Sequence, residues 1–211
     1  MINMPKKQLA LIWMSSGNSY FTEEIIGTLI NFANENYPKI MVLSPDKPAE
    51  HNFRAVGYSE NKVRKKAKLG ANLLINRFKR QLLKIDAKDK FNFVNWETEV
   101  LNNSEYKKKY VELMSLYKNN LNFRKDARNI TKDVITNKFK DIKIDIENTI
   151  DEAVLYLIEE FAFIFACPII YDVDYIYYLY HHNWYIFENL ISGKYDGKKR
   201  SNFKFILTGI K

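Results

Sequence analysis

The sequence predicts an α/β protein in which a mostly parallel sheet is flanked by helices in a Rossmann-like arrangement. Two buried-strand patterns, at 9–14 and 39–43, enclose a helical pattern at 22–36. A strand, a helix and a strand within this length indicate a β-α-β unit and therefore parallel strands. The chain has 211 residues, of which 46% are hydrophobic, enough to bury one core. We therefore expect a single domain over residues 1–211.

The first β-α-β unit follows from its apolar runs and its breakers. Residues 9–14 are a continuous apolar run that ends at two serines and a glycine, as a buried strand does. Thr22 has the side chain of an N-cap, so a helix is expected from there to about residue 36. Pro38 closes this helix, and residues 39–43 form the second strand.

The rest of the chain reads as longer helices separated by short strands. Residues 44–58 carry two prolines and a glycine and read as a surface loop. Later helices are expected at 59–84, 104–118, 120–139, 149–165 and 183–192, and later strands at 91–94 and 203–207. The tyrosine-rich segment between Pro168 and Tyr180 is compatible with either a strand or a helix.

Composition limits the class of protein. The chain has 33 Lys and Arg against 25 Asp and Glu, a net charge of +8, which favours a polyanionic partner. One cysteine, Cys167, excludes an intrachain disulfide framework and a Cys-rich zinc site, and three histidines give little basis for a His site, so no metal is expected. The most apolar run, 161–171, is shorter than the roughly 20 residues of a membrane span, and the polar start shows no secretory leader. We expect a cytoplasmic protein that does not bind membranes.

A polar turn, Ser15-Ser16-Gly17-Asn18-Ser19-Tyr20-Phe21, follows the first strand. In open α/β sheets, ligands bind at the carboxyl ends of strands, so a serine there is a candidate nucleophile. The turn is not a Gly-x-Ser-x-Gly nucleophile elbow, because Trp13 stands where the first glycine would be. An ordinary strand-to-helix turn remains the alternative.

The helix expected at 59–84 combines an apolar stripe with a basic face. The stripe consists of Val63, Ala67, Ala71, Leu74, Phe78 and Leu82. The basic residues are Lys62, Lys65, Lys66, Arg77, Arg80 and Lys84, and no acidic residue lies between the first and the last of them. A face of one charge sign repels itself unless an anion lies against it, so we expect it to bind a nucleic-acid backbone. A merely solvated face is the alternative.

Two further pairs of residues have side chains that could do chemistry. Tyr156 and Glu160 are four apart on an apolar helix and share a face. They either point into a pocket that holds a cation, or Glu160 reaches the edge of the helix. Tyr180 and His181 end the aromatic tract, where the alternative is plain aromatic core.

Together these segments resemble the tRNA-dependent cyclodipeptide synthases over essentially the whole chain. The resemblance comprises LALIWMSSGNSYF at 9–21, the basic helix, SEY at 104–106 with the helices that follow, Tyr156-x-x-x-Glu160, and the Tyr-His at 180–181. It implies a fold similar to the catalytic domain of class I aminoacyl-tRNA synthetases, without a working ATP site.

The resemblance also implies roles for individual residues. Ser15 matches the nucleophile, Tyr156 and Glu160 match the pair that holds the aminoacyl ammonium, and Tyr180 matches a tyrosine of the second half-reaction. The expected substrate-binding residues are Trp13, Gly17, Asn18, Asn137 and His181. Trp13 stands where the family usually has a small residue, which predicts a first pocket of altered shape.

The implied activity is the joining of two aminoacyl groups from aminoacyl-tRNAs into a 2,5-diketopiperazine. It would proceed by a ping-pong mechanism through an aminoacyl-serine, in a monomer that needs neither ATP nor a metal. A tRNA-binding module without chemistry is the main rival. A serine esterase is disfavoured, because no histidine and acid are placed to assist the serine. The sequence leaves the identity of the joined amino acids open.

Overall fold

Five parallel strands form one sheet in the computed structural model, which describes residues 7–86, 88–140, 142, 145–180 and 184–207. The order across the sheet is β3-β2-β1-β4-β5, and all four neighbouring pairs are parallel. The strands are β1 (Gln8–Trp13), β2 (Ile40–Leu43), β3 (Phe91–Phe93), β4 (Tyr175–Tyr180) and β5 (Phe203–Leu207). The predicted Rossmann-like sheet is confirmed.

This strand order contains a topological switch point between β1 and β4. After β1 the chain builds β2 and β3 on one side, and it then returns to pair β4 with the other side of β1. Connections that leave neighbouring strands in opposite directions open a crevice at their carboxyl ends. Ser15 follows β1 and Tyr180 ends β4, so both lie at this crevice.

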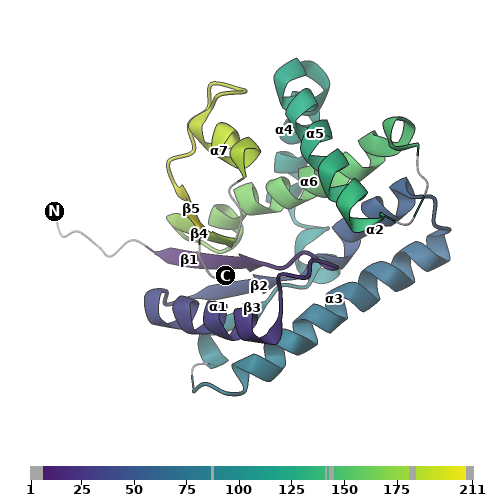
Figure 1. Ribbon diagram of the computed structural model, residues 1–211. Helices are drawn as coiled ribbons and strands as arrows, with labels where there is room; N and C mark the ends of the chain where they lie inside the picture. Colours follow the sequence, from purple (N-terminus) through teal and green to yellow (C-terminus); the bar gives the residue numbers. More distant parts are fainter. Residues whose placement is uncertain (1–6, 87, 141, 143–144, 181–183, 208–211) are drawn as a thin grey trace.

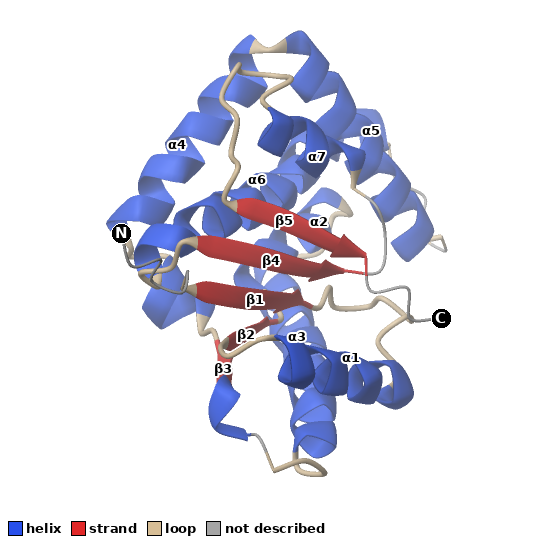
Figure 2. Cartoon of the chain, turned by 90° about the vertical axis from the view of Figure 1, so that its left-hand side faces the viewer, coloured by secondary structure: helices blue, strands red, loops and turns tan. Residues whose placement is uncertain are grey.

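The helices cover both faces of the sheet (Figures 1 and 2). They are α1 (Glu23–Asn36), α2 (Asp46–Ala55), α3 (Glu60–Leu82), α4 (Ser104–Asn119), α5 (Leu121–Lys138), α6 (Ile146–Ile170) and α7 (Tyr185–Ser192), with two short turns, η1 (Lys88–Lys90) and η2 (Trp96–Val100). Figures 1 and 2 show α1 and α3 on one side of the sheet and α4 to α7 on the other. The helix α2 packs against both α3 and α6.

Several local predictions are confirmed. The Thr22 hydroxyl accepts a hydrogen bond from the Ile25 N–H and caps α1. All six residues of the predicted apolar stripe of α3 are buried. The tyrosine-rich segment contains β4, and the last strand has the predicted bounds.

The predicted loop at 44–58 was wrong, because most of it is the helix α2. Pro48 is the third residue of this helix, in the first turn, where N–H groups have no intrahelical acceptor. The proline therefore removes no helical hydrogen bond there. Burial of Ala49, Asn52 and Ala55 stabilises the helix against the rest of the protein.

The predicted end of the apolar helix at 165 was also wrong. The helix α6 continues through Pro168 to Ile170. Pro168 lies in the last turn, so the helix loses one hydrogen bond near its end while Ala166 and Cys167 remain fully buried. With its 25 residues α6 is long and apolar enough to cross a membrane, but 67% of its most apolar window is buried in the protein.

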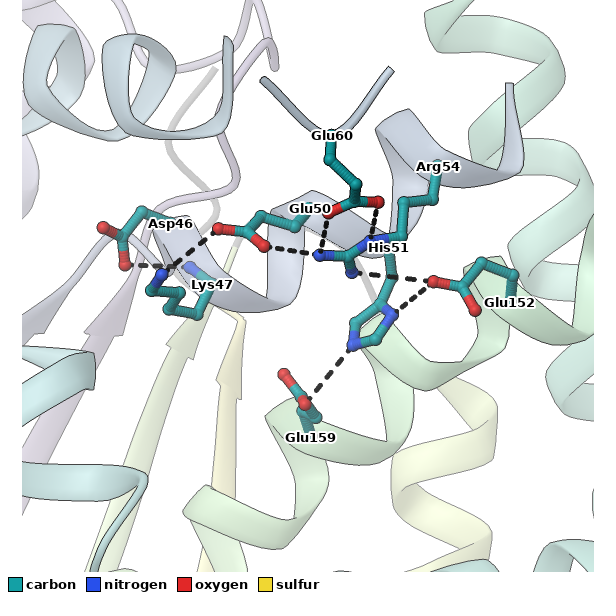
Figure 3. A network of polar contacts seen from close by, with 8 residues as sticks. All are labelled: Asp46, Lys47, Glu50, His51, Arg54, Glu60, Glu152 and Glu159. Carbon is teal, nitrogen blue, oxygen red and sulfur yellow. Dashed lines mark hydrogen bonds and ion pairs between the residues drawn. The ribbon is translucent and has the colours of Figure 1, made fainter. Parts of the chain in front are cut away.

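A polar network joins α2 to α6 (Figure 3). The His51 ring nitrogens lie 2.8 Å from Glu152 and 3.3 Å from Glu159, and Arg54 bonds Glu50 and Glu60. Burial by itself lowers the pKa of His51, but Glu159 and Glu152 outweigh it, so the net pKa is raised and the protonated ring is favoured. These contacts fix α2 on the helix that carries Tyr156 and Glu160.

Candidate active site

A cavity of about 440 Å³ opens where β1 and β4 end. Its wall comes from the polar turn 15–21, here called the serine turn, and from α2, α5, α6, the end of β4 and the segment after it. Six predicted site residues line it: Ser15, Gly17, Asn18, Asn137, Tyr156 and Tyr180. Residues that lie up to 165 positions apart in the sequence therefore meet in one place, and the volume suits a small organic group.

The serine turn has a defined backbone. Gly17 has a φ of +80°, a left-handed conformation that side chains disfavour. The Asn18 N–H donates to the Ser15 carbonyl, and the Asn18 side chain accepts from the Tyr20 N–H at 3.0 Å. Asn18 therefore closes the turn with both its backbone N–H and its side-chain oxygen.

The hydroxyl of Ser15 lies between two tyrosines. The Tyr156 hydroxyl is 3.4 Å from the Ser15 Oγ and donates to it, and the Trp13 indole N–H donates to Tyr156 at 3.4 Å. Burial and the charge of Glu160 raise the pKa of Tyr180, while its hydrogen bonds with Ser15 and Asn18 lower it in part. Burial also raises the pKa of Tyr156 well above its ordinary value. Both phenols are therefore neutral at pH 7, and their hydroxyls can donate hydrogen bonds.

Glu160, one helical turn after Tyr156 on α6, is fully buried. It accepts a hydrogen bond from the Tyr178 hydroxyl at 3.0 Å, and its second carboxyl oxygen is buried with no partner among the described residues. Burial raises the pKa of Glu160 well above its ordinary value, which the Tyr178 bond offsets only in part. An unpartnered buried oxygen is costly unless a donor satisfies it, so Glu160 can accept one further hydrogen bond from a donor that reaches it.

Lys138, the last residue of α5, was missed by the sequence reasoning. Its ammonium donates to the Ser16 carbonyl at 2.7 Å and lies 5.4 Å from the centre of the Phe53 ring. Burial lowers its pKa to about 8, and no carboxylate among the described residues pairs with it. A Cβ on Gly17 would lie 3.0 Å from the Lys138 side chain. The lysine therefore clamps the serine turn to α5.

Two predicted site residues do not line the cavity. Trp13 is fully buried, with its ring 6.1 Å from that of Trp96 and 6.2 Å from that of Phe163, and among the described residues its indole N–H bonds Tyr156, which lines the cavity. Glu160 also lies behind the lining. His181 falls outside the described residues.

The basic face of α3 is less uniform than its sequence suggested. Arg80 forms an ion pair with Glu23 of α1 at 2.6 Å, and Arg77 donates to the Phe21 carbonyl. The ammonium groups of Lys66 and Lys84 lie against Tyr58 and Gln81. Lys62 and Lys65 are exposed and, within the described residues, have no polar partner. The acidic partner of Arg80 comes from another helix, so inspection of α3 alone could not find it.

Most of the unpredicted lining comes from α5 and α2. The sequence signal for α5 was available, because Thr131, Val134 and Lys138 share one helix face with Asn137 beside it. Asn52 also lines the cavity, but it lies in the segment that reads as a loop. Only the packing of α2 on α6 brings it to the site.

Comparison with known proteins identifies a family. The model of the family described as cyclodipeptide synthase matches residues 4–207. The cyclo(L-leucyl-L-leucyl) synthase of Staphylococcus haemolyticus is 20% identical over 96% of this chain and 87% of its own. That of Bacillus subtilis is 21% identical over 96% of this chain and 82% of its own.

Solved structures share the fold. A cyclodipeptide synthase from Staphylococcus haemolyticus has a TM-score of 0.79 at 20% identity, covering 94% of this chain and 89% of that one. A Mycobacterium tuberculosis protein has a TM-score of 0.74 at 18% identity over 94% and 84%, and its structure is described as relating such enzymes to type I tRNA synthetases. An enzyme from Candidatus Glomeribacter gigasporarum, solved with Phe-tRNAPhe, has a TM-score of 0.66 at 15% identity over 99% and 91%.

Proposed function

Since the chain belongs to the cyclodipeptide synthase family, we propose that it joins two aminoacyl groups, each delivered on tRNA, into a 2,5-diketopiperazine. The observation that carries this proposal is the position of the Ser15 hydroxyl, which lies at the switch point between Tyr156 and Tyr180 in a cavity. The fold is that of an enzyme family related to class I aminoacyl-tRNA synthetases. An aminoacyl ester is already activated, so the proposed reaction uses neither ATP nor a metal.

The first half-reaction is an ester exchange. The Ser15 oxygen attacks the ester carbonyl of the first aminoacyl-tRNA, an ester to serine forms, and the bond to the terminal ribose oxygen breaks. The serine proton passes to that leaving oxygen, whereas the Tyr180 hydroxyl is our candidate for shuttling protons in the second half-reaction. The Asn18 N–H is already bonded to Ser15, so the N–H groups of Ser16 and Gly17 are our candidates to stabilise the oxyanion.

The second half-reaction forms two amide bonds. The neutral amine of the second aminoacyl-tRNA attacks the acyl-serine, which gives a dipeptidyl-tRNA and returns the proton to Ser15. The free amine of the dipeptide then attacks the remaining ester, closes the six-membered ring and releases the tRNA hydroxyl. Tyr156 and Glu160 hold the first ammonium in place through hydrogen bonds, which are charge-assisted at Glu160.

The reaction itself provides the test. The protein incubated with aminoacylated tRNA is expected to produce diketopiperazines that mass spectrometry detects, without ATP and with a chelator present. Free amino acids with ATP serve as the control and are expected to give none. Product from the free amino acids, or no product from charged tRNA, would contradict the proposal.

Lys138→Met tests whether the clamp on the serine turn contributes to acylation. Without the bond to the Ser16 carbonyl the turn loses its register, and we expect acylation to slow by about tenfold to a hundredfold. Lys138→Arg, which keeps a donor, is expected to recover part of the rate. An unchanged rate in Lys138→Met would show that the clamp is not needed.

The same variant has a separate effect on stability. The folded protein holds the Lys138 proton with a pKa of about 8 and the unfolded chain with an ordinary pKa of 10.5. Between these values the unfolded chain binds more protons, so stability from this group rises with pH. The free energy of unfolding of Lys138→Met, measured with a chemical denaturant, should therefore not show this rise with pH. At pH 7 it should be no lower than that of the wild type. Lower activity in an equally stable protein separates positioning from misfolding.

A further inference from the structure

The uncharged middle of α3 carries two exposed leucines inside the basic face. Leu69 is 55% exposed and Leu73 is 58% exposed. At 100° per residue, Lys62, Lys66 and Arg80 lie within roughly 60° of the direction that the two leucines share. The face is therefore cationic before the leucines and apolar at them, and Arg80 after them is paired with Glu23. Single exposed leucines are ordinary, but an exposed pair that directly follows lysines without an ion pair to any described residue is a distinct surface.

The helix α3 passes next to the turn that carries Ser15, at Gly70 between the two leucines. A Cβ on Gly70 would lie 3.0 Å from the Ser16 Cβ and 3.3 Å from its hydroxyl. The glycine lets α3 pass in van der Waals contact with the serine turn. Whatever binds across Leu69 and Leu73 therefore lies beside the turn where the ester must arrive.

The chemistry of the two leucines selects one part of a tRNA. A duplex presents phosphates and sugars outward and keeps the faces of its bases inside, so an apolar pair gains little from it. Unpaired nucleotides expose the faces of their bases, which pack on apolar side chains while their phosphates lie near cations. The 3′ end of a tRNA is unpaired and carries the aminoacyl ester.

We propose that Leu69 and Leu73 bind the unpaired bases at the 3′ end of the aminoacyl-tRNA and so guide the ester toward Ser15. The exposed ammonium groups of Lys62 and Lys65, one to three turns earlier, contact the phosphates of the adjoining duplex. This inference rests on the proposed function and adds which part of the RNA the middle of α3 recognises.

The test combines changes in the protein with changes in the RNA. The dissociation constant of each protein–RNA pair is measured at one fixed salt concentration. Leu69→Ser/Leu73→Ser is compared with the wild-type protein on whole tRNA and on tRNA that lacks its unpaired 3′ nucleotides. The double variant should bind whole tRNA about tenfold more weakly than the wild type does. Removal of the unpaired 3′ nucleotides should then not weaken the binding of the double variant any further. Leu83→Ser, at a residue that is 67% exposed beyond the end of α3, is the matched control and should bind as the wild type does.

The outcomes separate this inference from the proposed function. Equal losses for the double variant on whole and truncated tRNA, or no loss at all, would overturn the role of the leucines while tRNA binding itself stands. If the wild-type protein binds no tRNA, the proposed function fails first. Light scattering tests whether a second copy of the chain covers the leucines instead. A wild-type protein that is a dimer and a double variant that is a monomer would show that it does. Lys62→Gln/Lys65→Gln should weaken the binding of both RNAs equally and should reduce the salt dependence of that binding.

Discussion

Ser15→Ala is expected to abolish diketopiperazine formation and the covalent adduct together, with a loss of about 10³-fold or more in rate. The substitution removes only the hydroxyl group, whose oxygen accepts a hydrogen bond from Tyr156. Alanine fits the same space, so the turn and the cavity are expected to remain. The measurement is the mass of the protein after brief incubation with charged tRNA, where the wild type gains one aminoacyl group.

Ser19→Ala is the matched control for this experiment. Ser19 lies in the same turn and lines the same cavity, and the proposed reaction does not use its hydroxyl. We expect wild-type rates and a normal adduct. Adduct formation by Ser15→Ala would assign the covalent step to another residue. Binding of charged tRNA without an adduct in the wild-type protein would instead favour the rival tRNA-binding module.

Glu160→Gln is expected to reduce the efficiency of acylation by about a hundredfold. Glutamine preserves the size of the side chain and an acceptor for Tyr178, but it cannot carry the negative charge. A substrate ammonium would then lie against a neutral amide in a buried place, which is costly. The measurement is single-turnover acylation at saturating and subsaturating charged tRNA.

The protonation state of Glu160 makes this prediction sharper. Burial raises its pKa well above the ordinary value, which favours the neutral carboxyl group before the substrate binds. The substrate amine therefore either arrives protonated, in which case the proton of Glu160 is released to water, or arrives neutral and takes that proton. Both routes end in the same ion pair, which the glutamine variant cannot form.

Two other variants serve as comparisons for Glu160→Gln. Tyr178→Phe leaves the carboxyl group but removes the bond that lowers its pKa, so we expect a smaller loss of about tenfold. Glu159→Gln changes the adjacent carboxylate, which bonds His51 outside the cavity, and is expected to acylate normally. A wild-type rate in Glu160→Gln would remove this residue from the binding of the ammonium.

Local pattern was sufficient for most of the fold. The apolar runs of β1 and β2, the Thr22 cap and the stripe of α3 each depend on neighbours within a few residues, and each is confirmed. The two errors both concern proline. Pro48 and Pro168 lie in the first turn of α2 and the last turn of α6, where the cost of a proline is small and tertiary burial outweighs it.

For the candidate site, too, local sequence determined one part and tertiary structure the other. The chain itself specified which chemical groups are available: a hydroxyl after the first strand, a tyrosine and a carboxyl group on one helix face, and a second tyrosine at the end of the aromatic tract. Tertiary structure alone decided their partners. Lys138 on Ser16, Tyr178 on Glu160 and Glu23 on Arg80 join residues 122, 18 and 57 positions apart. Such contacts depend on the order of the strands and the packing of helices, which no local spacing encodes.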